Sequence, residues 1–262
     1  MSPPPTPSVA NAIASTARLS WLRVVRGNKL WVALVAVALV VLSITGARYA
    51  QDGRGGADIL KEGVNLGFFN LLVFLVPFLF TSGAIAEEVE GRTFHFLTSR
   101  PISRFSLLIG KYISGVGMSA LLLLGALLLT HLATLATDPT AMFEALPDTA
   151  RAGGALLMLT MLYGAICMFW GAVAPEAAGT LSVLYLAVME FGFGSAPFFL
   201  RVISLNFLGK ELAGLPRGGL LAETVPELPV WAGAAAIPTV TLIFLGLAMV
   251  TITTSEYRFG KA

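Results

Sequence analysis

Charge is scarce in this chain of 262 residues, and cysteine is almost absent. Only 12% of the residues are charged, about half of the roughly 25% typical of globular domains, and 56% are hydrophobic, which excludes an ordinary soluble enzyme, a disordered chain and a coiled coil. The 17 basic and 15 acidic residues nearly balance, which argues against a nucleic-acid-binding protein. The single cysteine, Cys167, excludes an internal disulfide or a multi-cysteine metal site. The composition therefore predicts an integral membrane protein.

Long gaps between charged residues predict the membrane-spanning helices. About 20 apolar residues, at a rise of about 1.5 Å each, cross a hydrocarbon core of about 30 Å. The gaps predict an all-α fold with six spans. The expected spans are about 30–47, 63–86, 112–137, 152–175, 177–200 and 230–255. Glu190 interrupts the fifth run, and splitting the run there gives an alternative of five spans and a surface helix.

The segment before the first span divides into a tail and a helix. Residues 1–10 are rich in proline, which predicts a disordered tail. Residues 11–29 predict an amphipathic helix that lies in the membrane interface, with a flexible basic leader as the alternative. The expected apolar face holds Ile13, Ala17, Trp21, Leu22, Val24 and Val25, and the basic face holds Arg18, Arg23 and Arg26. With both termini in the cytoplasm, ten basic residues lie inside and seven outside, so this orientation is expected.

The segment 87–111, between the second and third spans, carries seven charged residues. Three of them, Glu87, Glu88 and Glu90, follow the end of a helix, where carboxylates oppose the helix dipole. They therefore suggest a positive partner, either within the loop or on another chain. A short amphipathic helix over 93–99 is expected to end before Pro101. The alternative is a solvated connector between the two spans.

The segment 87–111 also contains a sequence signature that resembles one found in a known protein family. The run Glu88-Val-Glu-Gly-Arg-Thr, then Leu97-Thr-Ser-Arg-Pro-Ile-Ser-Arg and Gly110-Lys111, resembles the signature of ABC-2 type permeases, with the NosY-like subgroup most similar. One departure is Arg92, which separates Gly91 from Thr93, whereas the family usually has the glycine and threonine adjacent. The resemblance implies the membrane subunit of an exporter in the bacterial inner membrane, present as a homodimer or as a pseudo-dimer with a related permease.

The resemblance also implies a cytoplasmic ATP-binding partner, which holds ATP and Mg and drives the permease through the N-terminal helix and this loop. The implied coupling residues are Glu87, Glu88, Glu90, Gly91, Arg92, Thr93, Phe94, Phe96, Leu97, Pro101, Arg104 and Lys111. The chain has no Gly-x-x-x-x-Gly-Lys-Ser/Thr phosphate loop and no His-Glu-x-x-His zinc motif. We therefore expect a subunit that is not an enzyme, binds no cofactor itself and contacts membrane lipid.

Glu190 is the remaining candidate, because an ionisable group inside an apolar span is costly and calls for a partner or a role. It could belong to the translocation path or make a structural hydrogen bond. Two rival functions stay open beside the ATP-driven exporter. One is an ion-coupled secondary transporter that uses Glu190 as its proton site, and the other is a non-transporting component that passes mechanical work from an ATPase to an external partner.

Overall fold

The computed structural model describes residues 8–51, 54–85, 103–194, 198–216 and 229–254, and every regular element in these ranges is helical. The all-α fold is thereby confirmed for the described residues. The α-helices are α1 Val9–Arg26, α2 Asn28–Ala50, α3 Gly56–Gly63, α4 Val73–Thr81, α7 Arg104–Leu135, α8 Pro139–Glu144, α9 Leu146–Val173, α10 Ala178–Tyr185, α11 Leu205–Ala213 and α12 Val230–Thr254. The π-helices are η1 Val64–Leu72 and η3 Leu186–Gly192, and the 3₁₀ helices are η2 Pro175–Ala177 and η4 Phe198–Ile203.

Among the described residues, five helices are long and apolar enough to cross a membrane. They are Asn28–Ala50, Gly56–Ile85, Arg104–Leu135, Leu146–Val173 and Val230–Thr254. The second of these runs without a break through α3, η1 and α4. Each helix contains nearly the whole of one predicted apolar run, and four of the five begin before it. The third begins at Arg104, directly after the N-cap Ser103, whose side chain accepts a hydrogen bond from the Ser106 amide.

The predicted fifth span, 177–200, differs in the structure. The 8 residues of α10 continue into the 7 residues of η3, and the helix then ends in a turn. At about 1.5 Å per residue this helix is too short for a core of about 30 Å. A Cβ at Gly194 would lie 2.0 Å from the Glu190 carbonyl oxygen, so only glycine permits this turn. A sixth span is therefore not confirmed, and the break falls just after Glu190.

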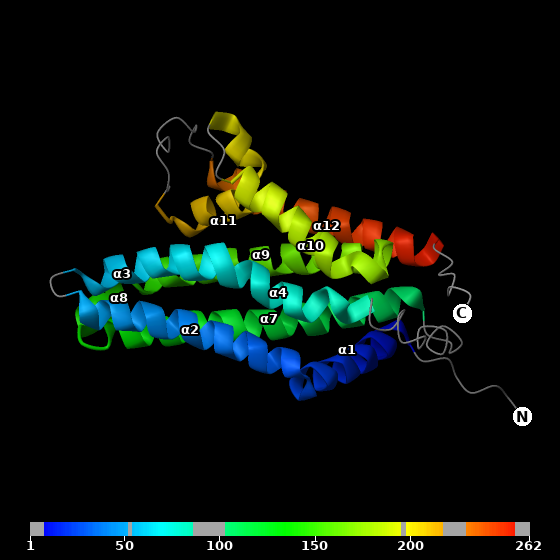
Figure 1. The fold of residues 1–262 in the computed structure, drawn as a ribbon, viewed down its shortest axis with the longest axis horizontal. Helices are drawn as coiled ribbons and strands as arrows, with labels where there is room; N and C mark the ends of the chain where they lie inside the picture. Colours follow the sequence, from blue (N-terminus) through cyan, green and yellow to red (C-terminus); the bar gives the residue numbers. More distant parts are fainter. Residues whose placement is uncertain (1–7, 52–53, 86–102, 195–197, 217–228, 255–262) are drawn as a thin grey trace, which may run out of the picture.

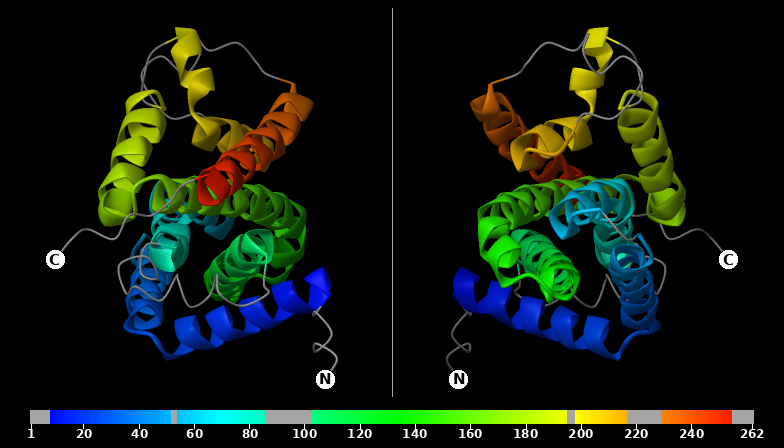
Figure 2. Two further views of the ribbon diagram at one scale, coloured as in Figure 1. Left: turned by 90° about the vertical axis from the view of Figure 1, so that its right-hand side faces the viewer. Right: turned by 90° about the vertical axis from the view of Figure 1, so that its left-hand side faces the viewer.

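Helix α9 forms the centre of the bundle. It contacts α4 and α7 on one side and α10, α11 and α12 on the other, an arrangement visible in Figures 1 and 2. Within its most apolar stretch 67% of the residues are buried, against 17% in α2 and 22% in α12. The core is therefore built around α9, whereas α2 and α12 keep wide apolar faces for lipid or for another chain.

Helix α1 gives the bundle two different ends (Figure 1). The chain bends at Gly27, between α1 and α2, and α1 then lies across α7 (Figure 2). One end holds α1, the start of α7 and the last turn of α12, and we call it the α1 end. The opposite end holds α3 and α8, and we call it the α3 end. The predicted coupling residues in the described ranges lie at the α1 end.

Candidate coupling site

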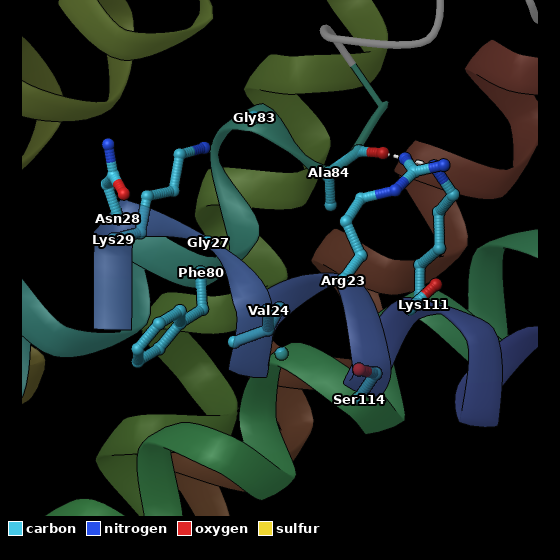
Figure 3. Close-up of a pocket in the computed structure, with 12 residues that line it drawn as sticks. Arg23, Val24, Gly27, Asn28, Lys29, Phe80, Gly83, Ala84, Lys111 and Ser114 are labelled. Carbon is cyan, nitrogen blue, oxygen red and sulfur yellow. Dashed lines mark hydrogen bonds between the residues drawn. The ribbon is translucent and has the colours of Figure 1, made fainter. Parts of the chain in front are cut away.

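A basic cavity of about 300 Å³ lies at the α1 end (Figure 3). It is enclosed by α1, the start of α2, the last turn of the Gly56–Ile85 helix and the first turns of α7. Its cationic lining residues are Arg23, Lys29 and Lys111, and none of the described lining residues is acidic. Two of these three, Arg23 and Lys111, belong to the predicted interfacial and coupling sets, so the structure brings those sets together.

Lys111 ties α7 to the end of the second membrane helix. Its ammonium group donates a hydrogen bond to the Ala84 carbonyl oxygen, and its side chain is buried. The last carbonyl groups of a helix have no partner within the helix and carry a partial negative charge, so a cation there stabilises the end. Figure 3 shows the Arg23 and Lys111 side chains both reaching toward Ala84. The last described turn of the second helix is therefore anchored to α7.

Arg104 makes the corresponding contact with the last turn of α12. Its Nη1 group donates to the Ile252 carbonyl oxygen at 2.7 Å and to the Thr253 carbonyl oxygen at 3.2 Å. Arg104 is the first residue of α7, and Lys111 lies two turns further along the same helix. The start of α7 thus holds the ends of two other helices. Sequence reasoning assigned both cations to a partner protein and missed these contacts within the chain.

Gly110 sets how closely α1 approaches α7. A Cβ on Gly110 would lie 2.7 Å from the Thr16 Cβ and 3.0 Å from the Ile13 carbonyl oxygen, both on α1. Any side chain would therefore push α1 away. The neighbouring residues of the Gly110-Lys111 pair thus have separate structural tasks. The glycine makes room for α1, and the lysine caps the end of the second helix.

The predicted apolar face of α1 is divided between residues that pack on α7 and residues that are exposed. Ile13, Ala17, Trp21 and Val24 are partly buried, as expected for the apolar face. Leu22 and Val25, also on the predicted apolar face, are exposed beside basic residues, and the placement of α1 in the membrane interface stays a prediction. From Arg18 to the end of the helix, the exposed side chains are Arg18, Leu19, Leu22, Arg23, Val25 and Arg26. The reason is that α7 covers one side of α1, so the remaining apolar residues stay on the outer side, where they suit a membrane interface.

The remaining predicted coupling residues lie outside the described residues. They are Glu87, Glu88, Glu90, Gly91, Arg92, Thr93, Phe94, Phe96, Leu97 and Pro101. Their flanks are described, since Ala84 precedes this segment and Arg104 follows it. The described flanks place both attachment points of the segment at the α1 end.

Glu190 caps a helix that sequence reasoning did not foresee. Its Oε2 atom accepts hydrogen bonds from the Asn206 amide at 3.0 Å and from the Ser204 hydroxyl at 2.7 Å. Both donors lie at the N-terminus of α11, where a carboxylate complements the helix dipole. Ser204 is also the N-cap and accepts from the Phe207 amide. A serine before an apolar run is the signal that could have located this helix start.

Helix α11 is held at its other end as well. The Arg151 Nε group donates to the Leu212 carbonyl oxygen at 2.6 Å, and Gly214 ends the helix at a φ of 69°. The Lys210 ammonium donates to the Asn70 side-chain oxygen on η1. Burial, with a contribution from the Arg201 charge, lowers the pKa of Lys210 to about 8, so the ammonium form still predominates at neutral pH. In the described ranges no group of three His, Cys, Asp or Glu residues could hold a metal ion.

We expect Gly110→Val to displace α1 from α7, because its Cβ would enter the space of Thr16. Over-packing of this kind costs about 1–3 kcal/mol. Trypsin digestion of the detergent-solubilised protein measures the effect, since Arg18 and Arg26 are exposed cleavage sites on α1. Cleavage within α1 should become faster in this variant.

Gly125→Val is the matched control, because a Cβ at Gly125, on the same helix, meets no atom within 4 Å. It makes the same change in helix propensity without crowding a neighbour. If both variants are digested at the rate of the wild type, Gly110 does not set the position of α1.

Glu190→Gln and Glu190→Leu test whether Glu190 stabilises the protein by offering an acceptor oxygen to α11. Glutamine keeps an oxygen that can accept from the Asn206 amide, so its stability should stay close to that of the wild type. Leucine leaves buried donors without a partner, which costs about 1–3 kcal/mol. Unfolding in a denaturing detergent titration measures the difference. A glutamine variant as unstable as the leucine variant would show that the negative charge itself is required.

The comparison with known families agrees with this architecture. Residues 15–262 match the family described as ABC-2 family transporter protein. No curated protein matches the chain. The family match does not distinguish subgroups, so the NosY-like assignment stays a prediction. With apolar helices long enough to cross a membrane and a family match over nearly its whole length, the chain belongs to the ABC-2 transporter family as a multi-pass membrane permease.

Proposed function

We propose that this permease works with a separate ATP-hydrolysing subunit and exports a substrate. The observation that carries the proposal is the joint at the α1 end, where the first turns of α7 hold α1, the end of the second helix and the end of α12. A partner that pushes on the loop between Ala84 and Arg104 then acts on three helices at once. ATP and Mg belong to the partner, since the sequence has no phosphate loop.

The proposal requires direct contacts between the helices at the α1 end, so that a displacement of one moves the others. Lys111 is hydrogen-bonded to the last described turn of the second helix, and Arg104 is hydrogen-bonded to the last turn of α12. Gly110 brings α1 into direct contact with the same stretch of α7. A displacement at either flank of the loop is therefore passed to α7 without crossing a flexible segment. From α7 the movement reaches α9, which contacts α7 along the bundle.

We place the α1 end in the cytoplasm of a bacterial cell, with the protein in the inner membrane. Arg18, Arg23 and Arg26 are exposed on α1, and basic residues close to the first span favour the cytoplasmic side. A cytoplasmic ATPase could then reach the loop after the second helix. The wide apolar face of α2, which includes Trp31, Val35 and Leu42, suits lipid or a second permease in the dimer that we propose.

Reversing Glu88 and Glu90 to lysine should uncouple ATP hydrolysis from the permease and weaken the complex. Charges desolvated against a partner cost about 2–5 kcal/mol when left unpaired, which is roughly a 30-fold loss of affinity or more. Solvated acids would tolerate the change, because exposed ion pairs contribute only about 0.2–1 kcal/mol. Co-purification of the ATPase from native membranes, followed by its ATPase rate, measures the effect.

Glu144→Lys is the control for this experiment, because Glu144 is an exposed acid at the α3 end. It should retain the partner at the level of the wild type. A double reversal that keeps its partner and full coupled activity means that the loop is only a connector. Absence of any nucleotide-binding protein beside the wild type would count against the whole proposal.

Cysteine labelling tests the orientation. In a Cys167→Ser background, Gly55→Cys and Phe143→Cys at the α3 end should react with an impermeant maleimide added outside intact cells, because both positions are exposed. Arg18→Cys, exposed at the α1 end, should react only after the membrane is opened. Labelling of Arg18→Cys in intact cells would show that the orientation is the reverse of the proposed one, and it would exclude a cytoplasmic partner at the α1 end.

A further inference from the structure

The structure has a second cavity, unrelated to the coupling site, on the surface between α2 and the α3–η1 part of the second helix. We call it the α2–α3 groove. Its volume is about 570 Å³, within the range of about 300–1,000 Å³ found for small-molecule sites. It is lined by residues from Ala36 to Gln51 on α2 and from Ile59 to Leu71 on the facing helix, and by Arg54 between the two. The groove therefore lies along two membrane-spanning helices.

The groove is apolar along its length. Leu39 on one wall and Leu66 on the other are 61% and 57% exposed, so the groove is open to whatever surrounds the chain. Gly63 and Gly67 sit so close to α2 that a Cβ on either would lie within 2.7 Å of Ile44 or Val40. These contacts close the floor, while the outer part stays open. From Ala36 to Gln51 a helix rises about 22 Å, more than half of a hydrocarbon core of about 30 Å.

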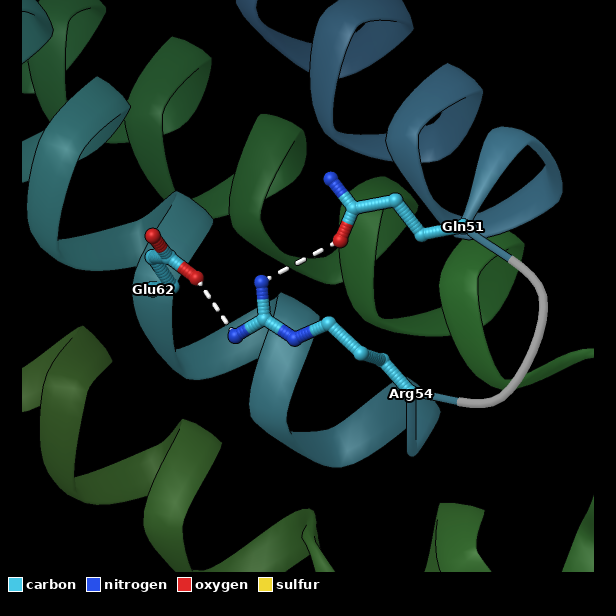
Figure 4. A network of polar contacts seen from close by, with 3 residues as sticks. All are labelled: Gln51, Arg54 and Glu62. Carbon is cyan, nitrogen blue, oxygen red and sulfur yellow. Dashed lines mark hydrogen bonds and ion pairs between the residues drawn. The ribbon is translucent and has the colours of Figure 1, made fainter.

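The mouth of the groove, at the α3 end, is polar and carries one basic and one acidic side chain, Arg54 and Glu62 (Figure 4). Arg54 donates from Nη1 to the Gln51 side-chain oxygen at 3.1 Å and from Nη2 to the Glu62 carboxylate at 2.8 Å. The Arg54 and Glu62 side chains are about half exposed, at 50% and 52%. A guanidinium group has five N–H donors, so donors remain for a further acceptor. One oxygen of Glu62 likewise remains for a further donor.

We propose that the α2–α3 groove binds a zwitterionic phospholipid, with one acyl chain in the groove and the headgroup at the mouth. Arg54 contacts the phosphate, since guanidinium pairs well with phosphate oxygens, and Glu62 contacts the ammonium group. The adjacent opposite charges match such a headgroup and fit an anionic headgroup less well, because Glu62 would then repel it. The lipid fills an opening that the sparse contacts of α2 leave in the bundle.

A second copy of the chain is a worse occupant on the same evidence. The central parts of protein interfaces are depleted in charged residues, and a helix entering the groove would bury Arg54 and Glu62. A phospholipid keeps both groups at the headgroup level, where water reaches them. The apolar walls do not require hydrogen bonds from their occupant, and an acyl chain makes none.

Lipid retention measured by native mass spectrometry tests the proposal. The purified protein is mixed with equal amounts of phosphatidylethanolamine and phosphatidylglycerol. We expect the wild type to retain phosphatidylethanolamine preferentially. Arg54→Gln should lower this retention about tenfold, as expected for one lost charge-assisted hydrogen bond. Ser43→Trp, which fills the groove from an exposed position on α2, should lower it without disturbing the mouth.

Lys61→Gln is the matched control. Lys61 lies on α3 like Glu62, is similarly exposed, and forms its own ion pair with Asp148, away from the groove. It removes one positive charge but should leave lipid retention unchanged. The proposal is overturned if both lipids are retained equally, if Lys61→Gln and Arg54→Gln behave alike, or if Ser43→Cys cross-links two copies of the chain with loss of lipid. None of these outcomes depends on the ATPase partner.

Discussion

The bundle depends on charged side chains that satisfy the ends of helices other than their own. The last carbonyls and first amides of a helix have no partner within it, so where they are shielded from water the protein must supply one. This chain has few charges, and several serve that purpose. Lys111 caps the second helix, Arg104 caps α12, and Glu190 and Arg151 hold the opposite ends of α11. Each contact also fixes the position of one helix relative to another.

Helix α11 shows why such contacts matter for a short element. A helix of 9 residues is marginal alone, and α11 is largely buried against α9, so the polar groups at its ends need partners from the protein. Glu190 places an acceptor oxygen at the amide end, and Arg151 places a donor at the carbonyl end, so each satisfies backbone groups that have no partner within the helix. The glutamate that looked anomalous inside an apolar run is thus explained by a neighbouring helix.

The sequence was sufficient to predict the elements that follow from composition alone. Apolar runs located five long helices, because that signal is local. It was insufficient where the outcome depends on tertiary contacts. The break at Gly194 follows from a backbone approach to Glu190, and the partners of Arg104 and Lys111 lie on distant helices. A charged residue in an apolar run predicts a partner, but the sequence alone does not identify that partner.

The same reasoning connects the ends of the bundle to its function as a transporter. At the α1 end, Lys111 and Arg104 on α7 hold the ends of the second helix and of α12, and Gly110 lets α1 pack on the same part of α7. At the α3 end, the Arg54–Glu62 pair bridges residues that lie at the edge of an open groove, and α2 is otherwise sparsely covered. In the mechanism that we propose, movement that starts at the α1 end would displace α2, which has the smallest buried share of the described membrane helices. The proposed mechanism requires such a difference between helices, because a uniformly rigid bundle could receive force but could not change the path between its helices.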